Sequence, residues 1–167
     1  MAESNAITAE EARAYLNYDA ETGLFTRKIS ISPRWLAGMA LGSNDMYGYK
    51  TVRINKRSYK LHRLAWLYTY GVWPSGDIDH INGNRSDNRI ANLRDVSRQV
   101  NLQNQRSSHR NKSTGIMGVY PDRRGNRFTA TISVDNKTLY LGAFGTAAEA
   151  QAAYLAAKRK HHAGCMV

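Results

Sequence analysis

One stretch of this chain limits what it can fold into: residues 106–114, Arg-Ser-Ser-His-Arg-Asn-Lys-Ser-Thr, hold no apolar side chain. Such a segment adds nothing to a hydrophobic core, and its polar, basic composition is typical of a linker. At 167 residues, 42% of them hydrophobic, the chain is long enough for one ordinary domain or two small ones. The stretch therefore predicts two modules, residues 1–105 and 115–167, joined by a linker.

Before the linker, the pattern predicts short strands and helices separated by turn-rich loops. Thr8 followed by Glu11 forms a capping box, which predicts a first helix that ends near residue 16. Leucine and aromatic residues predict a buried second helix, and Ser97 is placed to cap a third that ends near residue 105. Two of the strands are expected to form a hairpin around residues 55–57. The expected strands are residues 24–28, 49–54, 58–61, 77–81 and 93–96, and the second helix is residues 62–70.

After the linker, the pattern predicts three strands and one helix, so the whole chain belongs to the α+β class. The strands are expected over residues 118–121, 127–134 and 138–144, and Thr146 is placed to cap a helix reaching about residue 161. Alternation in the middle strand puts its apolar side chains on one face, where they can pack on the helix, and its polar side chains on the other.

The charge of the chain predicts a polyanionic partner. Lysine and arginine number 24 against 13 acidic residues, a formal net charge of +11, and the positive charge is denser after residue 105. No apolar run approaches the ~18 residues of a membrane span, so nucleic acid is favoured over a membrane. The single cysteine, Cys165, excludes an internal disulfide and a cysteine-built zinc site. With no signal-like start, a cytoplasmic location is expected, in the host cell if a phage encodes the chain.

An acid and an imidazole stand side by side at Asp79 and His80, with two amides downstream. Asn92 follows His80 by 12 positions, and Asn101 follows Asn92 by 9. The carboxylate and an amide oxygen can hold a hard cation, while the histidine can take a proton from water near neutral pH. A lone Asp-His pair is more often a loop cap, but the joint spacing favours a one-metal hydrolytic site.

This spacing, together with the words Asp-His-Ile-Asn-Gly-Asn and Asn-Arg-Ile-Ala-Asn-Leu, resembles the HNH endonuclease family. More narrowly, it resembles the phage and homing subgroup in which the third letter is asparagine (HNN). The resemblance covers about residues 49–105 and implies a ββα-metal core, two strands and a helix clasping one divalent ion, Mg²⁺ or Mn²⁺. It implies that Asp79 and Asn101 bind the metal and His80 is the general base. It also implies that Asn92 ties the loop and orients the histidine.

Other polar residues near this constellation are open to two interpretations. His62 and Arg63 precede the second helix, where similar HNH proteins carry a His-Arg pair. A structural role for the histidine is the alternative, and the arginine can reach a phosphate. The loop after His80 holds further polar side chains, for which backbone hydrogen bonding is expected in most cases and base contact is the alternative. These loop residues are Asn82, Asn84, Asn88 and Arg89, of which the arginine is the DNA-binding candidate.

The C-terminal module resembles the ethylene-response-factor DNA-binding domain of plants. The resemblance covers about residues 115–164 and rests on Gly-Val-Tyr at 118–120, Tyr-Leu-Gly-Ala-Phe at 140–144 and Thr-Ala-Ala-Glu-Ala at 146–150. It implies a three-stranded antiparallel sheet, backed by a helix, that enters the major groove. A polar face without a ligand is the alternative. The expected DNA-binding residues are Arg123, Arg124, Arg127, Thr129 and Thr131.

Two main hypotheses follow for the function. The first is a metal-dependent DNA endonuclease that nicks or cleaves duplex DNA. The second is a non-catalytic, sequence-specific DNA-binding regulator with an inactive nuclease module. An RNA-binding module is a third, which lacks the usual stacking motifs. The chain is expected to act as a monomer or homodimer, because one HNH centre cuts one strand at a time.

Overall fold

The computed structural model describes residues 6–30, 32–34, 36–105, 113–162 and 164–165. It divides the chain into two compact units, Met1–Ser97 and Arg98–Val167. The expected linker, residues 106–114, lies outside the described residues except for its last two positions. The predicted module borders at residues 105 and 115 therefore stay predictions.

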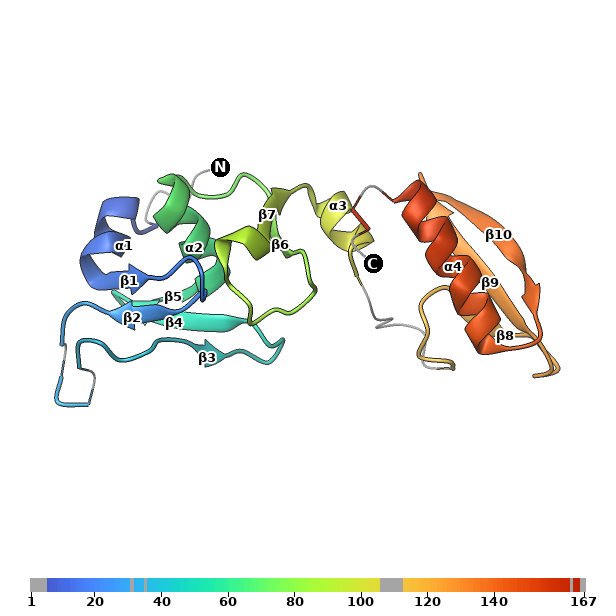
Figure 1. Cartoon of the computed structure of the whole chain (residues 1–167), viewed down its shortest axis with the longest axis horizontal. Helices are drawn as coiled ribbons and strands as arrows, with labels where there is room; N and C mark the ends of the chain where they lie inside the picture. Colours follow the sequence, from blue (N-terminus) through green and yellow to red (C-terminus); the bar gives the residue numbers. More distant parts are fainter. Residues whose placement is uncertain (1–5, 31, 35, 106–112, 163, 166–167) are drawn as a thin grey trace. The chain divides into compact units, whose positions relative to one another are not determined.

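The first unit combines two α-helices and a short 3-10 helix with small antiparallel sheets (Figure 1). Its sheets pair β1 with β2, β3 with β4 and β5, and β6 with β7. In chain order, the elements are α1 (Ala9–Tyr15), β1 (Leu16–Tyr18), β2 (Phe25–Arg27), β3 (Ser43–Asn44), β4 (Lys50–Ile54), β5 (Arg57–Lys60), α2 (Leu61–Tyr70), β6 (Asp77–His80), the 3-10 helix η1 (Ile90–Asn92) and β7 (Leu93–Val96).

Local chemistry sets most of these boundaries as expected. Thr8 and Glu11 form the predicted capping box at α1. Asn55 and Lys56 both have positive φ, as a two-residue turn requires, so β4 and β5 form the predicted hairpin. Gly71 adopts the left-handed conformation that ends α2. Strands β1 and β3 were not predicted.

The core of the first unit gathers apolar side chains from both helices and from the sheets. Leu16 and Phe25 of the β1–β2 hairpin are almost fully buried, as are Leu61 and Leu64 of α2. Burying side chains of this size stabilises a fold by roughly 1.5–3 kcal/mol each. Ile78 of β6 and Leu93 of β7 belong to the same core, so the hairpin that follows α2 in the sequence is packed into this unit.

The second unit is a three-stranded antiparallel sheet packed on one long helix (Figure 1). The predicted strands and the predicted cap at Thr146 are confirmed, and Glu149 completes a capping box there. Buried Ala130 and Ile132 of the middle strand lie on the apolar face, as the alternation predicted. The elements are α3 (Arg98–Gln103), β8 (Val119–Pro121), β9 (Phe128–Val134), β10 (Lys137–Phe144) and α4 (Ala147–His161).

The mixed helix and sheet architecture confirms the α+β class. Helix α3 belongs to the second unit, while β6 and β7 belong to the first. The ββα-metal core therefore stays a proposal.

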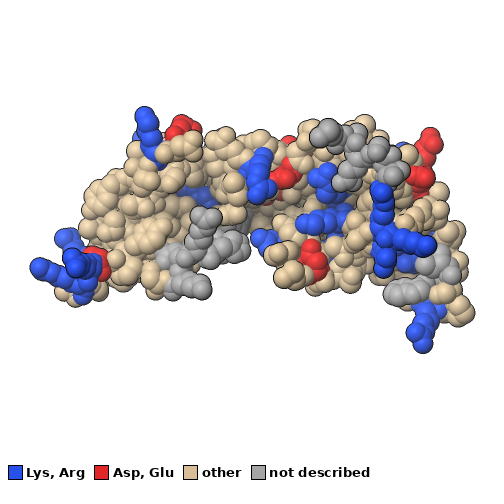
Figure 2. Space-filling model, turned by 180° about the vertical axis from the view of Figure 1, so that it is seen from behind, with Lys and Arg blue, Asp and Glu red and all other residues tan. Residues whose placement is uncertain are grey.

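Basic side chains are spread over the surface with acidic side chains among them, as the face in Figure 2 shows. Within the described ranges, no helix is both long and apolar enough to cross a bilayer.

Candidate active site

The β6–β7 hairpin holds the predicted catalytic pair in the interior of the first unit. Asp79 lies opposite Arg94 in the ladder, and His80 lies opposite Leu93. Only 5% of Asp79 and 4% of His80 is exposed. Burial of this depth is unusual for ionisable side chains, so each needs partners that offset the loss of hydration.

Asp79 is paired with Arg94 across the hairpin. Nε and one terminal nitrogen of Arg94 approach the carboxylate oxygen Oδ2 at 2.9 and 2.7 Å. No sequence pattern indicates this pair, because it depends on the register between the two strands. Arg94 neutralises a buried negative charge at the predicted metal ligand.

His80 is held by Asn88, a residue of the loop between β6 and η1. Its Nε2 lies 3.3 Å from Oδ1 of Asn88, and only 1% of Asn88 is exposed. Burial lowers the pKa of His80, against the opposing effects of the Asn88 hydrogen bond and the Asp79 charge. The imidazole is therefore neutral near pH 7, which is the form that accepts a proton.

A second imidazole lies against the first. The rings of His62 and His80 meet edge to face with centroids 5.1 Å apart, and Tyr49 lies 5.1 Å from the former and 5.9 Å from the latter. Burial, followed by the electrostatic effect of His80 and the positive charges of Lys60 and Arg63, lowers the pKa of His62 to about 3. His62 thus sits beside the candidate base, although the structure leaves its role open.

Asn92 ties the loop closed. Its Oδ1 accepts the backbone N–H of Asn82 at 2.9 Å, and its Nδ2 donates to Oδ1 of Asn82 at 3.1 Å and to the carbonyl oxygen of Asp87 at 2.9 Å. These contacts agree with the expectation that Asn92 ties the loop. Each of these hydrogen bonds joins the Asn92 side chain to the loop and not to the His80 ring.

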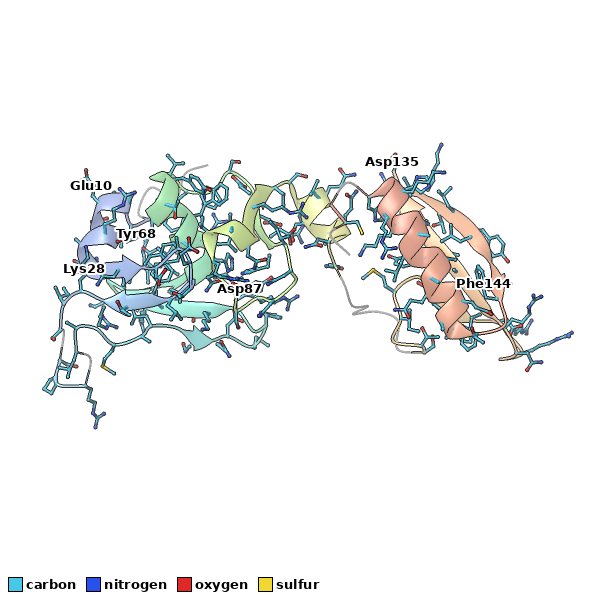
Figure 3. The ribbon with its side chains drawn as sticks, in the orientation of Figure 1. Glu10, Lys28, Tyr68, Asp87, Asp135 and Phe144 are labelled. Carbon is cyan, nitrogen blue, oxygen red and sulfur yellow. The ribbon has the colours of Figure 1, made fainter. Side chains whose placement is uncertain are left out.

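The other loop residues divide between two roles. Oδ1 of Asn82 and of Asn84 each accept a backbone N–H two residues on, as expected for turn chemistry. Asn88 instead faces His80. Its sequence context does not distinguish it from the other asparagines of the loop. Arg89 makes a bidentate pair with Asp87, at 2.8 and 2.6 Å. Asp87 is labelled in Figure 3. That pair holds the pKa of Asp87 down at about 2.

The β1–β2 hairpin packs against the loop after His80 and supports it, a role that the sequence analysis did not predict. The hydroxyl of Tyr18 donates to the carbonyl oxygen of Asn88 at 2.7 Å. Gly23 has φ +70°, and a Cβ atom there would lie 2.5 Å from the backbone nitrogen of Arg89. Only glycine allows this close approach.

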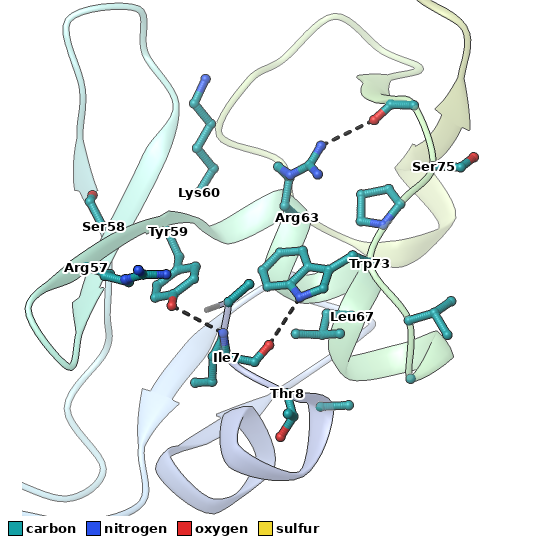
Figure 4. Close-up of a pocket in the computed structure, with 16 residues that line it drawn as sticks. Ile7, Thr8, Arg57, Ser58, Tyr59, Lys60, Arg63, Leu67, Trp73 and Ser75 are labelled. Carbon is teal, nitrogen blue, oxygen red and sulfur yellow. Dashed lines mark hydrogen bonds between the residues drawn. The ribbon is translucent and has the colours of Figure 1, made fainter. Parts of the chain in front are cut away.

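Arg63 borders a pocket of about 1390 Å³ that neither Asp79 nor His80 lines (Figure 4). One of its terminal nitrogens donates to the carbonyl oxygen of Gly76 at 3.2 Å, and its guanidinium lies 5.8 Å from the ring centre of Trp73. These contacts anchor the side chain, and its predicted reach to a phosphate stays a prediction.

The possible ligand atoms of this site are of the type that a hard divalent ion prefers, although few are present. Across the described residues, no three His, Cys, Asp or Glu side chains gather in one group. A carboxylate oxygen such as that of Asp79 suits Mg²⁺ or Mn²⁺, which keep water and phosphate ligands. A metal ion bound to Asp79 must either coexist with the Arg94 guanidinium or displace it. Asn101 is partly buried on α3 in the second unit, and its ligand role stays a prediction.

The predicted DNA-binding residues of the second unit lie on its strands and turns. The side chains of Arg123, Arg124 and Arg127 are exposed, and Thr129 and Thr131 are partly buried on β9. In the ladder, Tyr120 lies opposite Thr129, and Tyr140 lies opposite Thr131. These two exposed tyrosines share the threonine face of the sheet, and the sequence prediction did not include them.

Comparisons with known proteins bear on the first unit most directly. One solved structure is described as "DNA binding and cleavage by the HNH homing endonuclease I-HmuI"; it shares 19% identity, with 90% of this chain and 88% of that chain covered and a TM-score of 0.42. No curated protein matches the chain. Residues 59–103, which span α2, the β6–β7 hairpin and α3, match the family described as HNH endonuclease.

Proposed function

We propose that the chain is a metal-dependent DNA endonuclease that nicks or cleaves duplex DNA by hydrolysing a phosphodiester bond. The observation that carries this proposal is a buried, neutral His80 beside the Asp79 carboxylate, within the segment that matches the HNH endonuclease family. A phage or homing origin, with the HNN arrangement of the site, is part of the same proposal.

His80 is the general base in this mechanism. Its neutral ring takes a proton from the attacking water, and Asn88 fixes the ring through Nε2. General-base catalysis supplies about 10²- to 10⁴-fold in rate. Asp79 and Asn101 are the proposed ligands of Mg²⁺ or Mn²⁺, which when bound supplies positive charge for the developing phosphorane and the departing oxygen. Asn92 keeps the loop in the shape that presents these groups.

Duplex DNA is the proposed substrate, and the net charge of +11 supports it. Arg63 and Arg89 of the first unit are proposed to contact phosphates. In the second unit, the proposed contacts are Arg123, Arg124, Arg127, Thr129 and Thr131. A monomer suffices for nicking, whereas a double-strand break needs a homodimer or two events.

Nicking of supercoiled plasmid tests the metal requirement. We expect nicking in Mg²⁺ and none in EDTA, with a loss on the order of 100-fold or more for Asp79→Asn and for Asn101→Ala. Gln99→Ala on the same helix α3 is the matched control and should cleave normally. Cleavage that persists fully in EDTA would overturn the metal mechanism, and normal cleavage by Asn101→Ala would remove that residue from the site.

One observation favours the second candidate, a non-catalytic DNA-binding regulator. Arg94 is already paired with Oδ2 of Asp79, the carboxylate proposed to bind the metal. The same plasmid assay separates the two functions. A protein that binds DNA tightly but leaves the plasmid intact across a full Mg²⁺ and Mn²⁺ titration would be the regulator.

A further inference from the structure

Two cations lie around the ring of Tyr49, which neighbours His80. Nζ of Lys60 lies 4.4 Å from the centre of that ring, and Cζ of Arg85 lies 5.1 Å from it. The same ring lies 5.9 Å from the ring of His80. Two positive side chains therefore share one aromatic ring directly next to the proposed general base.

The carboxylates of this region are engaged elsewhere. Asp79 pairs with Arg94, and Asp87 pairs with Arg89. Oδ1 of Asp45 accepts two backbone N–H groups, those of Tyr47 and Tyr49. Within the described parts of the chain, neither Lys60 nor Arg85 forms an ion pair. Each cation instead contacts the ring of Tyr49, which attracts a positive charge without neutralising it.

Backbone contacts hold both cations in place. Lys60 ends β5 and is the N-cap of α2, so its main chain is fixed on both sides. A terminal nitrogen of Arg85 donates to the carbonyl oxygen of Tyr47 at 2.8 Å, and the hydroxyl of Ser86 donates to that of Gly48 at 3.2 Å. The loop after His80 is thus docked on the turn that carries Tyr49.

We propose that Lys60 and Arg85 bind the DNA phosphates next to the scissile phosphate, with Tyr49 as the spacer that holds them apart. This inference rests on the proposed nuclease function and names phosphate-binding residues for it. Phosphates of one strand follow one another at ~3.4 Å of rise, so cations one aromatic ring away from His80 meet the neighbours of the bond being cut. Lysine binds a phosphate as a point charge, and arginine binds it through paired donors.

Single-turnover cleavage of a duplex with one uncharged methylphosphonate beside the mapped cut site tests this inference. We expect the native protein to lose about 10-fold in rate on the substituted duplex. Lys60→Gln and Arg85→Gln should each lose a similar factor on the normal duplex, and the variant whose own phosphate carries the methylphosphonate should lose little more on the substituted one. Arg34→Ala, which removes an exposed charge on the same unit, should behave like the native protein.

Two results would overturn the inference: normal cleavage by both variants, or losses that multiply for both variants whichever phosphate next to the cut site carries the methylphosphonate. A failure of the proposed function would look different, because the native protein would then not cleave at all. In that case, binding of the normal duplex decides the inference. The double variant should lower the slope of log affinity against log salt by about 0.9 for each lost contact, while Arg34→Ala leaves it unchanged. A double variant with the native slope would contradict phosphate binding.

Discussion

The polar residues around His80 are buried and hydrogen-bonded, whereas the arginines of the second unit's proposed DNA-binding face are exposed. Asp79, Asn88 and Asn92 are each at most 7% exposed, and each makes specific side-chain hydrogen bonds. Arg123 and Arg127 are exposed on the connection between β8 and β9. A buried polar group loses its full hydration when its partner is removed, whereas an exposed arginine does not. Single substitutions should therefore act strongly in the first region and weakly in the second.

The largest effect on stability is expected for Arg94→Ala, which leaves the buried Asp79 carboxylate without its cation. The free energy of unfolding should fall by about 2–3 kcal/mol, somewhat less than for a fully buried pair because 23% of the Arg94 side chain is exposed. Arg127→Ala in the second unit is the control and should change it by less than ~0.5 kcal/mol.

Urea unfolding of both variants checks this contrast. Adding Asp79→Asn to Arg94→Ala should recover part of the loss, because the unpaired charge is then gone. Equal stability of Arg94→Ala and Arg127→Ala would show that the buried pair contributes little.

Gly23→Ala should destabilise the protein by about 2 kcal/mol and reduce the proposed cleavage, since the new methyl group would lie 2.5 Å from the backbone of Arg89 in the loop after His80. Gly38→Ala separates the effect of this close contact from the effect of a positive φ. Gly38 also has a positive φ, +82°, but open space around its Cβ position, so only the backbone strain of about 1 kcal/mol remains. If the two variants are equally active and equally stable, the β1–β2 hairpin does not support the loop.

His62 should make stability depend on pH in the acid range. Its pKa is about 3 in the folded state against 6.5 for the free side chain, so the unfolded chain binds more protons between these values. The stabilisation is complete above pH 6.5 and is lost as pH falls toward 3, by up to ~1.4 kcal/mol per pH unit. Urea unfolding at pH 7, 6 and 5 should show a shallower dependence for His62→Gln. An unchanged slope would mean that His62 is charged in the folded protein.

The smallest single effects are expected on the second unit. Arg123→Ala, Arg124→Ala and Arg127→Ala should each weaken binding to duplex DNA only a few-fold at physiological salt. Each lost phosphate contact should lower the slope of log affinity against log salt by about 0.9, and the effects of the three substitutions should add. Asp135→Asn on the far turn of the same sheet serves as the control. Unchanged slopes for all three arginine variants would assign DNA binding to another surface.

Features that depend on neighbouring residues followed from the sequence. The capping boxes at Thr8 and Thr146, the turn at Asn55 and the end of α2 at Gly71 are all decided by chemistry within a few residues. The strands of the second unit were predicted because their alternation extends over enough residues to be recognised.

Features that depend on distant contacts did not follow from the sequence. Asn88 has the same local chemistry as Asn84, and only the folded loop turns it toward His80. The partnership of Arg94 with Asp79 needs the register of the β6–β7 hairpin. Tyr49 lies far from His80 along the chain, so a pattern confined to the loop could not include it.

The most direct test of the catalytic role of the β6–β7 hairpin is single-turnover cleavage of duplex DNA in Mg²⁺ by the native protein and by His80→Ala, with DNA affinity measured on the same samples. We predict that cleavage falls by on the order of 100-fold or more while affinity stays within about 2-fold, because the imidazole acts on water and not on binding. Equal cleavage rates for a folded His80→Ala variant and the native protein would contradict a catalytic role for His80.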